Sequence, residues 1–217
     1  MTKHFRKELD NIKKRILTLS SLVEERVQSA TRAVENIDAE LALGIIKADY
    51  EIDEMEVEIE EECLKVLALH QPVAVDLRFI ISVIKINSEL ERIGDQAVNI
   101  AQRVEIIAKR PKPPFMFDYA EMGQKAQRML KMSLDSLVNL DVDIAYKVIT
   151  LDDEVDRIKN DAYDKIKQAI KDLPERVGYY INLLLISRHL ERLADHATNI
   201  AEEVIYLVEG EIYRHVE

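Results

Sequence analysis

The stretch LERIGDQAVNIAQRV, residues 90–104, returns later in the chain as LERLADHATNIAEEV, residues 190–204. Corresponding positions lie 100 residues apart, and apolar residues recur in both copies at steps of three and four, the spacing of one face of an α-helix. The apolar stripe consists of Val83, Ile86, Leu90, Ile93, Ala97, Ile100, Val104 and Ile107, and its copy of Leu183, Ile186, Leu190, Leu193, Ala197, Ile200, Val204 and Leu207. So sustained a stripe predicts a long helix in each half that packs lengthwise against its neighbours.

The duplication extends to an earlier segment of each half. Residues 36–53 return at 139–156, 103 positions later. The residues that recur are Asn36, Asp38, Ala42, Ile46, Asp49, Glu51 and Asp53, matched by Asn139, Asp141, Ala145, Ile149, Asp152, Glu154 and Asp156. Asn and Asp at this spacing are typical of a turn followed by a helix N-cap, so we expect Asp38 and Asp141 to begin a helix.

Helical patterns and prolines define the expected organisation. The patterns run over residues 7–34, 38–69, 75–107, 119–138, 141–171 and 176–208. Pro111, Pro113 and Pro114 interrupt them between the halves, because proline lacks the helix donor. We predict an all-α fold of six helices forming two tandem three-helix bundles. Residues 1–108 would form the first repeat, 109–118 a Pro-rich linker and 119–217 the second repeat.

Length and composition narrow the class of protein. The 217 residues include five Gly and no Trp, and a chain so rich in good helix formers is typical of helical bundles. The net charge of −11 argues against nucleic acid or an anionic membrane as the main partner. Cys63, the single cysteine, is interpreted as a small core residue in a reducing compartment. No apolar stretch resembles a signal peptide or approaches the ~20 residues of a membrane span, so a cytoplasmic location is expected.

Four pairs of acidic residues occupy corresponding places in the two halves. They are Asp49/Asp53, Glu91/Asp95, Asp152/Asp156 and Glu191/Asp195. A separation of four residues puts both carboxylates on one helix face, where like charges repel by a few tenths of a kcal/mol. Hard cations such as Mg²⁺, Ca²⁺, Mn²⁺ and iron would reverse that sign by binding several carboxylate oxygens at once. These eight acids are therefore candidate metal ligands, with Asn99 and Asn199 as less certain ones.

The competing interpretation of these acids is a solvated helix face. With the apolar stripe at the front, Asp95 falls about 190° behind it, so Glu91, Asp95 and Asn99 do not line the core of their own bundle. A merely solvated surface has no reason to retain acid, acid and amide at successive turns in both halves. Neighbouring positions do differ, since Gln96 corresponds to His196. We expect the acidic stripe to be exposed or to face something other than its own bundle.

Signatures of common catalytic sites do not occur in the sequence. There is no Gly-rich phosphate loop, HExxH motif, cysteine pair or strand pattern. A ferritin-like di-iron centre would also need Glu-x-x-His motifs, which are missing. His189 and His196 correspond to Glu89 and Gln96, which weakens a metal-ligand role for either histidine. The sequence does not predict an enzyme.

The duplicated plan closely resembles the PhoU family. The features that carry the resemblance are two three-helix units, an acidic pair on each second helix, ERxxDxAxNIA on each third helix, and QPVAVDLR at residues 71–78. The resemblance covers essentially the whole chain. In the second half LPERVGYY stands in place of QPVAVDLR, so a role of Asp76 or Arg78 does not carry over to Arg176 or Gly178.

The resemblance implies a cytoplasmic, commonly dimeric regulator of phosphate uptake and phosphate-starvation signalling. Members of the family bind clustered iron, zinc or manganese through E(D)xxxD motifs, which fall on the four acidic pairs. They act by contact, as negative regulators, on the phosphate sensor histidine kinase and on the ATPase subunit of the phosphate ABC transporter. The resemblance thus implies that the protein reaches the membrane only through partners.

Two other classes of function stay open on the sequence alone. One is a carboxylate-bridged metalloenzyme, which would need an open coordination position and a nearby general acid or base. The other is a purely structural helical scaffold whose acids are solvated. If the chain senses phosphate directly, we expect bound cations to mediate it, because a metal-free protein of charge −11 attracts phosphate poorly.

Overall fold

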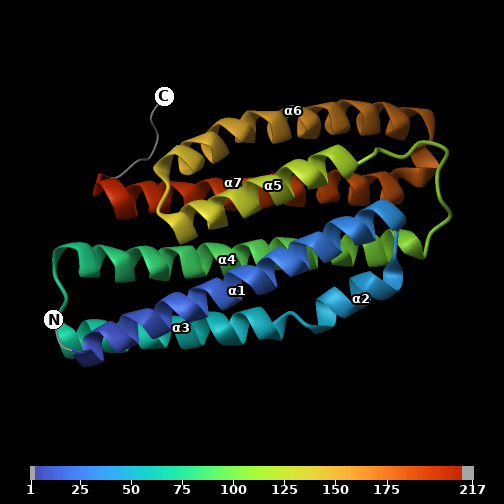
Figure 1. Ribbon diagram of the computed structural model, residues 1–217. Helices are drawn as coiled ribbons and strands as arrows, with labels where there is room; N and C mark the ends of the chain where they lie inside the picture. Colours follow the sequence, from blue (N-terminus) through green and yellow to red (C-terminus); the bar gives the residue numbers. More distant parts are fainter. Residues whose placement is uncertain (1–2, 212–217) are drawn as a thin grey trace.

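The computed structural model describes residues 3–211, which form helices and the segments that connect them, with no strand. The elements are α1 (Lys3–Asn36), α2 (Ala39–Lys47), α3 (Tyr50–His70), α4 (Ala74–Ala108), α5 (Ala120–Asn139), α6 (Val142–Asp172), the short 3₁₀ helix η1 (Pro174–Arg176) and α7 (Val177–Glu209). The prediction of an all-α fold with an internal duplication is confirmed (Figure 1).

The two repeats pack side by side along their third helices. Figure 1 shows α3, α4, α7 and α6 following one another from bottom to top, with α1 and α5 in front of them. Helix α4 packs along α7, and α1 also contacts α5. The chain runs through α4 and α7 in opposite directions, so the repeats are related by an approximate twofold axis between these helices.

The core contains both predicted apolar stripes and further residues of the same helices. Every residue of the two stripes on α4 and α7 is buried. Helix α4 is also buried at Gln96, on a second face, where its amide oxygen lies 2.9 Å from His189 of α7. Each third helix therefore belongs to its own bundle and to the interface between the repeats.

Equivalent caps begin the second helix of each repeat. An oxygen of the Asp38 side chain accepts a hydrogen bond from the Leu41 amide at 3.0 Å, and Asp141 accepts one from the Ile144 amide at 3.1 Å. The side-chain amide of Asn36 donates to the carbonyl oxygen of Arg32 at 2.9 Å. The predicted N-cap chemistry is confirmed, and it fixes where these helices start.

One predicted helix is divided. Residues 38–69 were expected to form a single helix, but the structure has α2 and α3 with a break at Ala48 and Asp49. Buried Arg26 donates to the carbonyl oxygen of Ile45 at 3.1 Å, and that oxygen would bond the Asp49 amide in a continuous helix. Arg26 corresponds to Met129 in the second repeat, where α6 is unbroken. The break therefore coincides with a hydrogen bond from a different helix.

Three further expectations concern the linker, Cys63 and membrane-spanning helices. The predicted linker, 109–118, lies in the non-helical segment between α4 and α5, and the outermost residues of the predicted repeats, 1–2 and 212–217, lie outside the described range. Cys63 is buried, and burial raises the pKa of its thiol to about 12, which suits a neutral core residue. Among residues 3–211, no helix combines the length and apolarity that crossing a membrane requires.

Candidate metal centre

The first acidic cluster lies where the start of α3 meets the middle of α4. It contains Asp49 and Asp53 from the α3 side and Glu91 and Asp95 from α4. Burial raises the pKa of Asp49, and the negative charges of Asp53 and Asp95 raise it further. Because Asp95 acts on Asp49 from another helix, the two predicted pairs of the first repeat converge into one group.

Glu91 is the most perturbed acid of the first cluster. Its pKa rises to about 7, first because of burial and then because of the charges of Asp95, Asp53 and Glu56. Burial and Asp53 also raise the pKa of Asp95, while the imidazole of His196 opposes that rise. Carboxylates whose charges act on one another in this way are electrostatically unfavourable without a cation, and their oxygens are the donors that hard cations prefer. Among residues 3–211, no three of these four acids bring their oxygens within 4.8 Å of one another.

The second acidic cluster is built in the same way from α6 and α7. It contains Asp152 and Asp156 on α6 and Glu191 and Asp195 on α7. The pKa of Asp152 rises to about 6, first because of burial and then through Asp195 and Asp156. All eight acids predicted from the sequence thus fall into two equivalent groups, one for each repeat.

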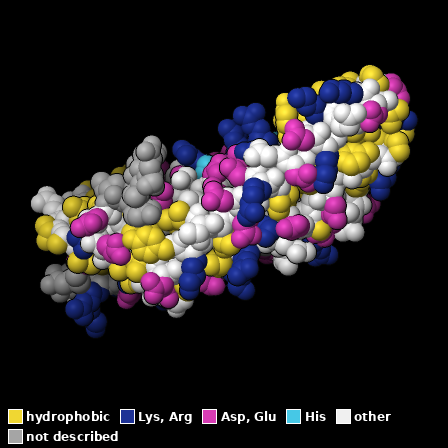
Figure 2. Space-filling model, turned by 90° about the horizontal axis from the view of Figure 1, so that it is seen from above, with side chains coloured by type: hydrophobic (Ala, Val, Ile, Leu, Met, Phe, Trp, Pro, Cys, Tyr) yellow, Lys and Arg dark blue, Asp and Glu magenta, His cyan; other side chains and the backbone are white. Residues whose placement is uncertain are grey.

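A lysine distinguishes the second cluster from the first. The Nζ atom of Lys159 lies 2.8 Å from an oxygen of Glu191 and 3.0 Å from an oxygen of Asp156, so it joins the two helices. An ammonium group therefore stands between the acidic pairs, which shows that the geometry accepts a positive charge there. Figure 2, which views the molecule from above, shows acidic side chains interspersed with Lys and Arg side chains over the surface seen from that side.

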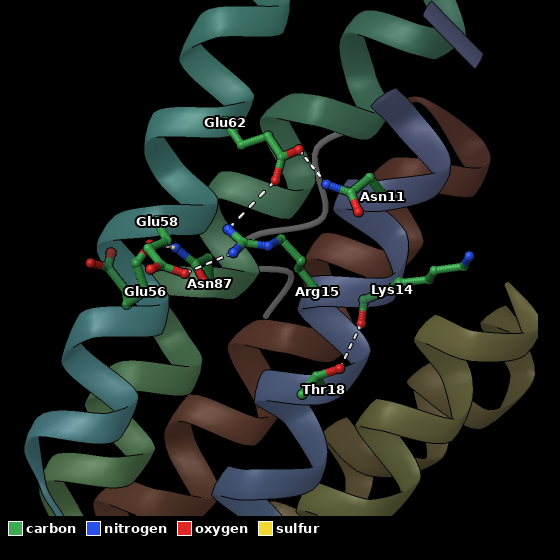
Figure 3. A network of polar contacts seen from close by, with 8 residues as sticks. All are labelled: Asn11, Lys14, Arg15, Thr18, Glu56, Glu58, Glu62 and Asn87. Carbon is green, nitrogen blue, oxygen red and sulfur yellow. Dashed lines mark hydrogen bonds and ion pairs between the residues drawn. The ribbon is translucent and has the colours of Figure 1, made fainter. Parts of the chain in front are cut away.

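The first cluster has an additional acid at the equivalent position. Lys159 corresponds to Glu56, whose pKa is raised by burial and then by Glu60 and Asp53. In Figure 3 the Glu56 side chain points away from Arg15, which instead pairs with Glu58 at 2.8 Å. The Glu56 backbone carbonyl accepts a hydrogen bond from Asn87 at 2.8 Å, which ties this turn of α3 to α4. Glu56 is thus a fifth acid of the first cluster, which the sequence argument missed.

A glycine permits the close approach of α3 to α4 beside the first cluster. A Cβ atom on Gly94 would lie 2.9 Å from Cδ1 of Ile52. The second repeat has Ala194 and Val155 at the equivalent positions, so a larger residue on one helix is matched by a smaller one on the other. The side chains that pack beside the acidic cluster therefore differ between the two repeats.

Asn99 and Asn199, one helical turn beyond the acids, differ in their contacts. Asn199 donates to a side-chain oxygen of Glu89 on α4 at 3.0 Å, across the interface between the repeats. Asn99 is half-buried on the corresponding part of α4. The structure thus gives Asn199 a bridging contact and supplies no ligand geometry for either amide.

Each of the two histidines on α7 contacts the residue of α4 that corresponds to the other histidine. His196 Nδ1 lies 2.7 Å from an oxygen of Glu89, and His189 Nδ1 lies 2.9 Å from the amide oxygen of Gln96. These pairs are exchanged by the approximate twofold axis. The sequence carries a signal for them, because histidine replaces Glu89 and Gln96 of the first copy at the corresponding positions of the second.

Comparison with known proteins agrees with this duplicated architecture. A family model for the PhoU domain matches residues 16–104 and matches again at residues 119–204. The chain belongs to the PhoU family.

Relatives and solved structures within the PhoU family cover nearly all of the chain. The phosphate-specific transport system accessory protein PhoU homolog of Pseudomonas aeruginosa is 36% identical over 217 residues, which is 100% of this chain and 90% of that protein. The protein of the same name from Aquifex aeolicus is 39% identical over 96% of this chain and 95% of its own length. The crystal structure of PhoU from Pseudomonas aeruginosa superimposes with a TM-score of 0.91 at 37% identity, covering 95% of this chain and 100% of that one.

The names of these relatives describe a role in phosphate transport. They are called accessory proteins of a phosphate-specific transport system, and a solved relative from Streptococcus pneumoniae is called a regulatory protein of that system. None of these names states a catalytic activity.

Proposed function

We propose that this protein is a metal-binding cytoplasmic regulator of phosphate uptake and of phosphate-starvation signalling. The observation that carries the proposal is the convergence of two acidic pairs from neighbouring helices, repeated in both halves of the molecule. Its metal ligands would be Asp49, Asp53, Glu91 and Asp95 in the first repeat and Asp152, Asp156, Glu191 and Asp195 in the second.

The donor set fits iron or manganese and accepts zinc. All donors are carboxylate oxygens, which suit hard cations, and zinc also binds Asp and Glu oxygens. The raised pKa of Glu91, about 7, and that of Asp152, about 6, mean that the clusters resist full ionisation by themselves. A bound cation would relieve this repulsion and convert an acidic patch into one that attracts anions.

Partner contact is the second part of the proposal. The relatives are named accessory proteins of a phosphate-specific transport system, which supports an action on that system. From the resemblance to the PhoU family, the protein would act on the phosphate ABC transporter through the ATPase subunit and on the phosphate sensor histidine kinase. It would be a negative regulator, a homodimer, and peripheral to the membrane only through these partners. This role requires no catalytic reaction, because binding alone can shift the activity of a partner.

Replacing the central pair of the first cluster tests this function. Glu91→Gln with Asp95→Asn keeps the shape of both side chains and removes two ligand charges. We expect less Mn²⁺ and Fe bound per chain by elemental analysis, together with weaker binding to the purified histidine kinase. Glu24→Gln with Glu25→Gln removes the same charge from an exposed part of α1 and should change neither measurement.

The competing functions predict different results. A scaffold would bind metal and kinase equally well before and after the Glu91 and Asp95 replacements. A metalloenzyme would lose a reaction while kinase binding stayed the same. Equilibrium dialysis against phosphate addresses the sensing step, since equal phosphate binding by metal-stripped and metal-loaded protein would contradict cation-mediated sensing.

A further inference from the structure

Two histidines and a glutamate come together at the end of the first bundle, away from both acidic clusters. His4 and Glu8 lie one turn apart on α1, and His70 is the last residue of α3. One ligand atom from each of the three side chains lies within 4.8 Å of the other two. His70 Nε2 is 2.5 Å and His4 Nε2 is 3.5 Å from different oxygens of Glu8.

We propose that His4, Glu8 and His70 form a separate site for a transition-metal ion, with Zn²⁺ as its preferred occupant among common cellular cations. Two imidazoles and one carboxylate are a ligand set that zinc accepts, with bonds of about 2.0–2.2 Å. Ligand atoms around a tetrahedral zinc ion are about 3.4 Å apart, so His4 and Glu8 already have suitable spacing. His70 Nε2, which now lies 2.5 Å from Glu8, would have to move about 1 Å farther from that oxygen to reach the same spacing.

Two of the three ligands are held in place by the fold. The side chains of Glu8 and His70 are only 16% and 20% exposed. The ring of His70 packs 4.9 Å from that of Phe5, and Gln71 turns the chain sharply with a left-handed φ of 45°. The His4 side chain is 73% exposed, so it can rotate toward an ion. This arrangement supplies a pre-positioned pair and one adjustable ligand, with a fourth position open to water or to a partner's side chain.

The chemistry of this site differs from that of the acidic clusters. Imidazole nitrogen favours zinc and other late transition metals, whereas an all-carboxylate site favours hard cations. The two kinds of site would therefore take different metals from the same solution. The ion would also fasten the first turns of α1 to the end of α3, directly before residues 71–78.

Competition with a zinc-sensitive chelator tests the site in full-length protein that carries no affinity tag. We expect His4→Ala and His70→Gln each to weaken the tightest Zn²⁺ binding by more than about tenfold. Asp10→Asn removes an exposed carboxylate two residues beyond Glu8 and should leave Zn²⁺ binding unchanged. Circular dichroism and Mn²⁺ binding, both expected to be unchanged, establish that each variant is folded.

The inference does not rest on the proposed regulatory function. In a Glu91→Gln/Asp95→Asn background, the effect of His4→Ala on Zn²⁺ binding should persist. Equal Zn²⁺ affinity in the wild type, His4→Ala and His70→Gln would overturn the site. An equally large loss in Asp10→Asn would overturn it as well, because the effect would then reflect general charge rather than these three ligands.

Discussion

Lys159 is the residue that makes the two acidic clusters unequal. Its ammonium pairs with Asp156 and Glu191, whereas the equivalent Glu56 adds a negative charge to the first cluster. A cation entering the second cluster must compete with that ammonium. A cation entering the first cluster is attracted by five acids. The first cluster should therefore bind divalent metal more tightly than the second.

Replacement of Lys159 by methionine should strengthen metal binding at the second cluster. Loss of the internal positive charge leaves Asp156 and Glu191 without their counter-charge, and we expect Mn²⁺ affinity there to rise at least about fivefold by calorimetry. Lys147→Met removes an exposed lysine of the same helix and serves as the control. Weaker or unchanged Mn²⁺ binding in Lys159→Met would contradict the assignment.

The raised pKa of Glu91, about 7 against 4.5 in the unfolded chain, makes the stability of the metal-free protein depend on pH. Between these values the folded state binds more protons, so stability falls as pH rises and the destabilisation is complete above about pH 7. We expect Glu91→Gln to stabilise metal-free protein at pH 8 by on the order of 1 kcal/mol after solvent screening, and to have little effect near pH 4.5. Urea denaturation at both pH values measures this. A Glu91→Gln variant less stable than wild type at pH 8 would argue against the repulsive cluster.

At the same scale, the sequence pointed to the eight acids as candidate metal ligands but not to how they interact. The equal spacing in both repeats identified all eight. Glu56 is one of many acids in α3, so the sequence did not single it out. The pairing of Lys159 with Glu191 depends on the distance between α6 and α7. Contacts between helices cannot be read from the periodicity of one helix, and so the difference between the clusters emerged only from the structure.

At the scale of helices, Gly94 and Ile52 set how closely α3 approaches α4. Gly94→Ala should gain helix propensity yet strain the contact with Ile52, while Ile52→Val alone should cost about 0.5–1.5 kcal/mol by loss of buried volume. The combined variant reproduces the Ala194 and Val155 pair of the second repeat. We expect it to be more stable than the sum of the single changes by about 1 kcal/mol, as measured in a denaturation double-mutant cycle. Strict additivity would show that the two residues do not limit the approach.

The helices themselves were largely predictable, with one informative exception. Apolar stripes and the caps at Asp38 and Asp141 determine most boundaries, because these signals are local. The break between α2 and α3 depends on Arg26, which reaches Ile45 from a different helix. Tertiary hydrogen bonds of this kind override local helix propensity and leave no periodic trace in the sequence.

Across the whole molecule, polar contacts along α4 and α7 accompany the buried apolar surface between the repeats. Lys85 pairs with Glu203 at 2.9 Å, and Glu89 and Gln96 pair with His196 and His189. Burial by itself would raise the pKa of Glu89, but hydrogen bonds from His196 and Asn199 outweigh it and lower that pKa. Glu89 is thus ionised at neutral pH and accepts two contacts from the other repeat.

The approximate twofold axis relates a charged contact, Glu89 with His196, to a neutral one, Gln96 with His189, so the two can be compared within one protein. Glu89→Ala should lower the free energy of unfolding by about 1.5–3 kcal/mol at pH 7, because His196 and Asn199 lose a charged acceptor. Gln96→Ala breaks the equivalent neutral contact with His189 and should cost only about 0.5–1.5 kcal/mol. Since the pKa of Glu89 is lowered on folding, its contribution is present above pH 4.5 and is lost as the pH falls further, so the two variants should converge in acid. Urea denaturation at pH 7 and pH 4 distinguishes the cases. A larger cost for Gln96→Ala at pH 7 would show that charge at Glu89 does not hold the repeats together.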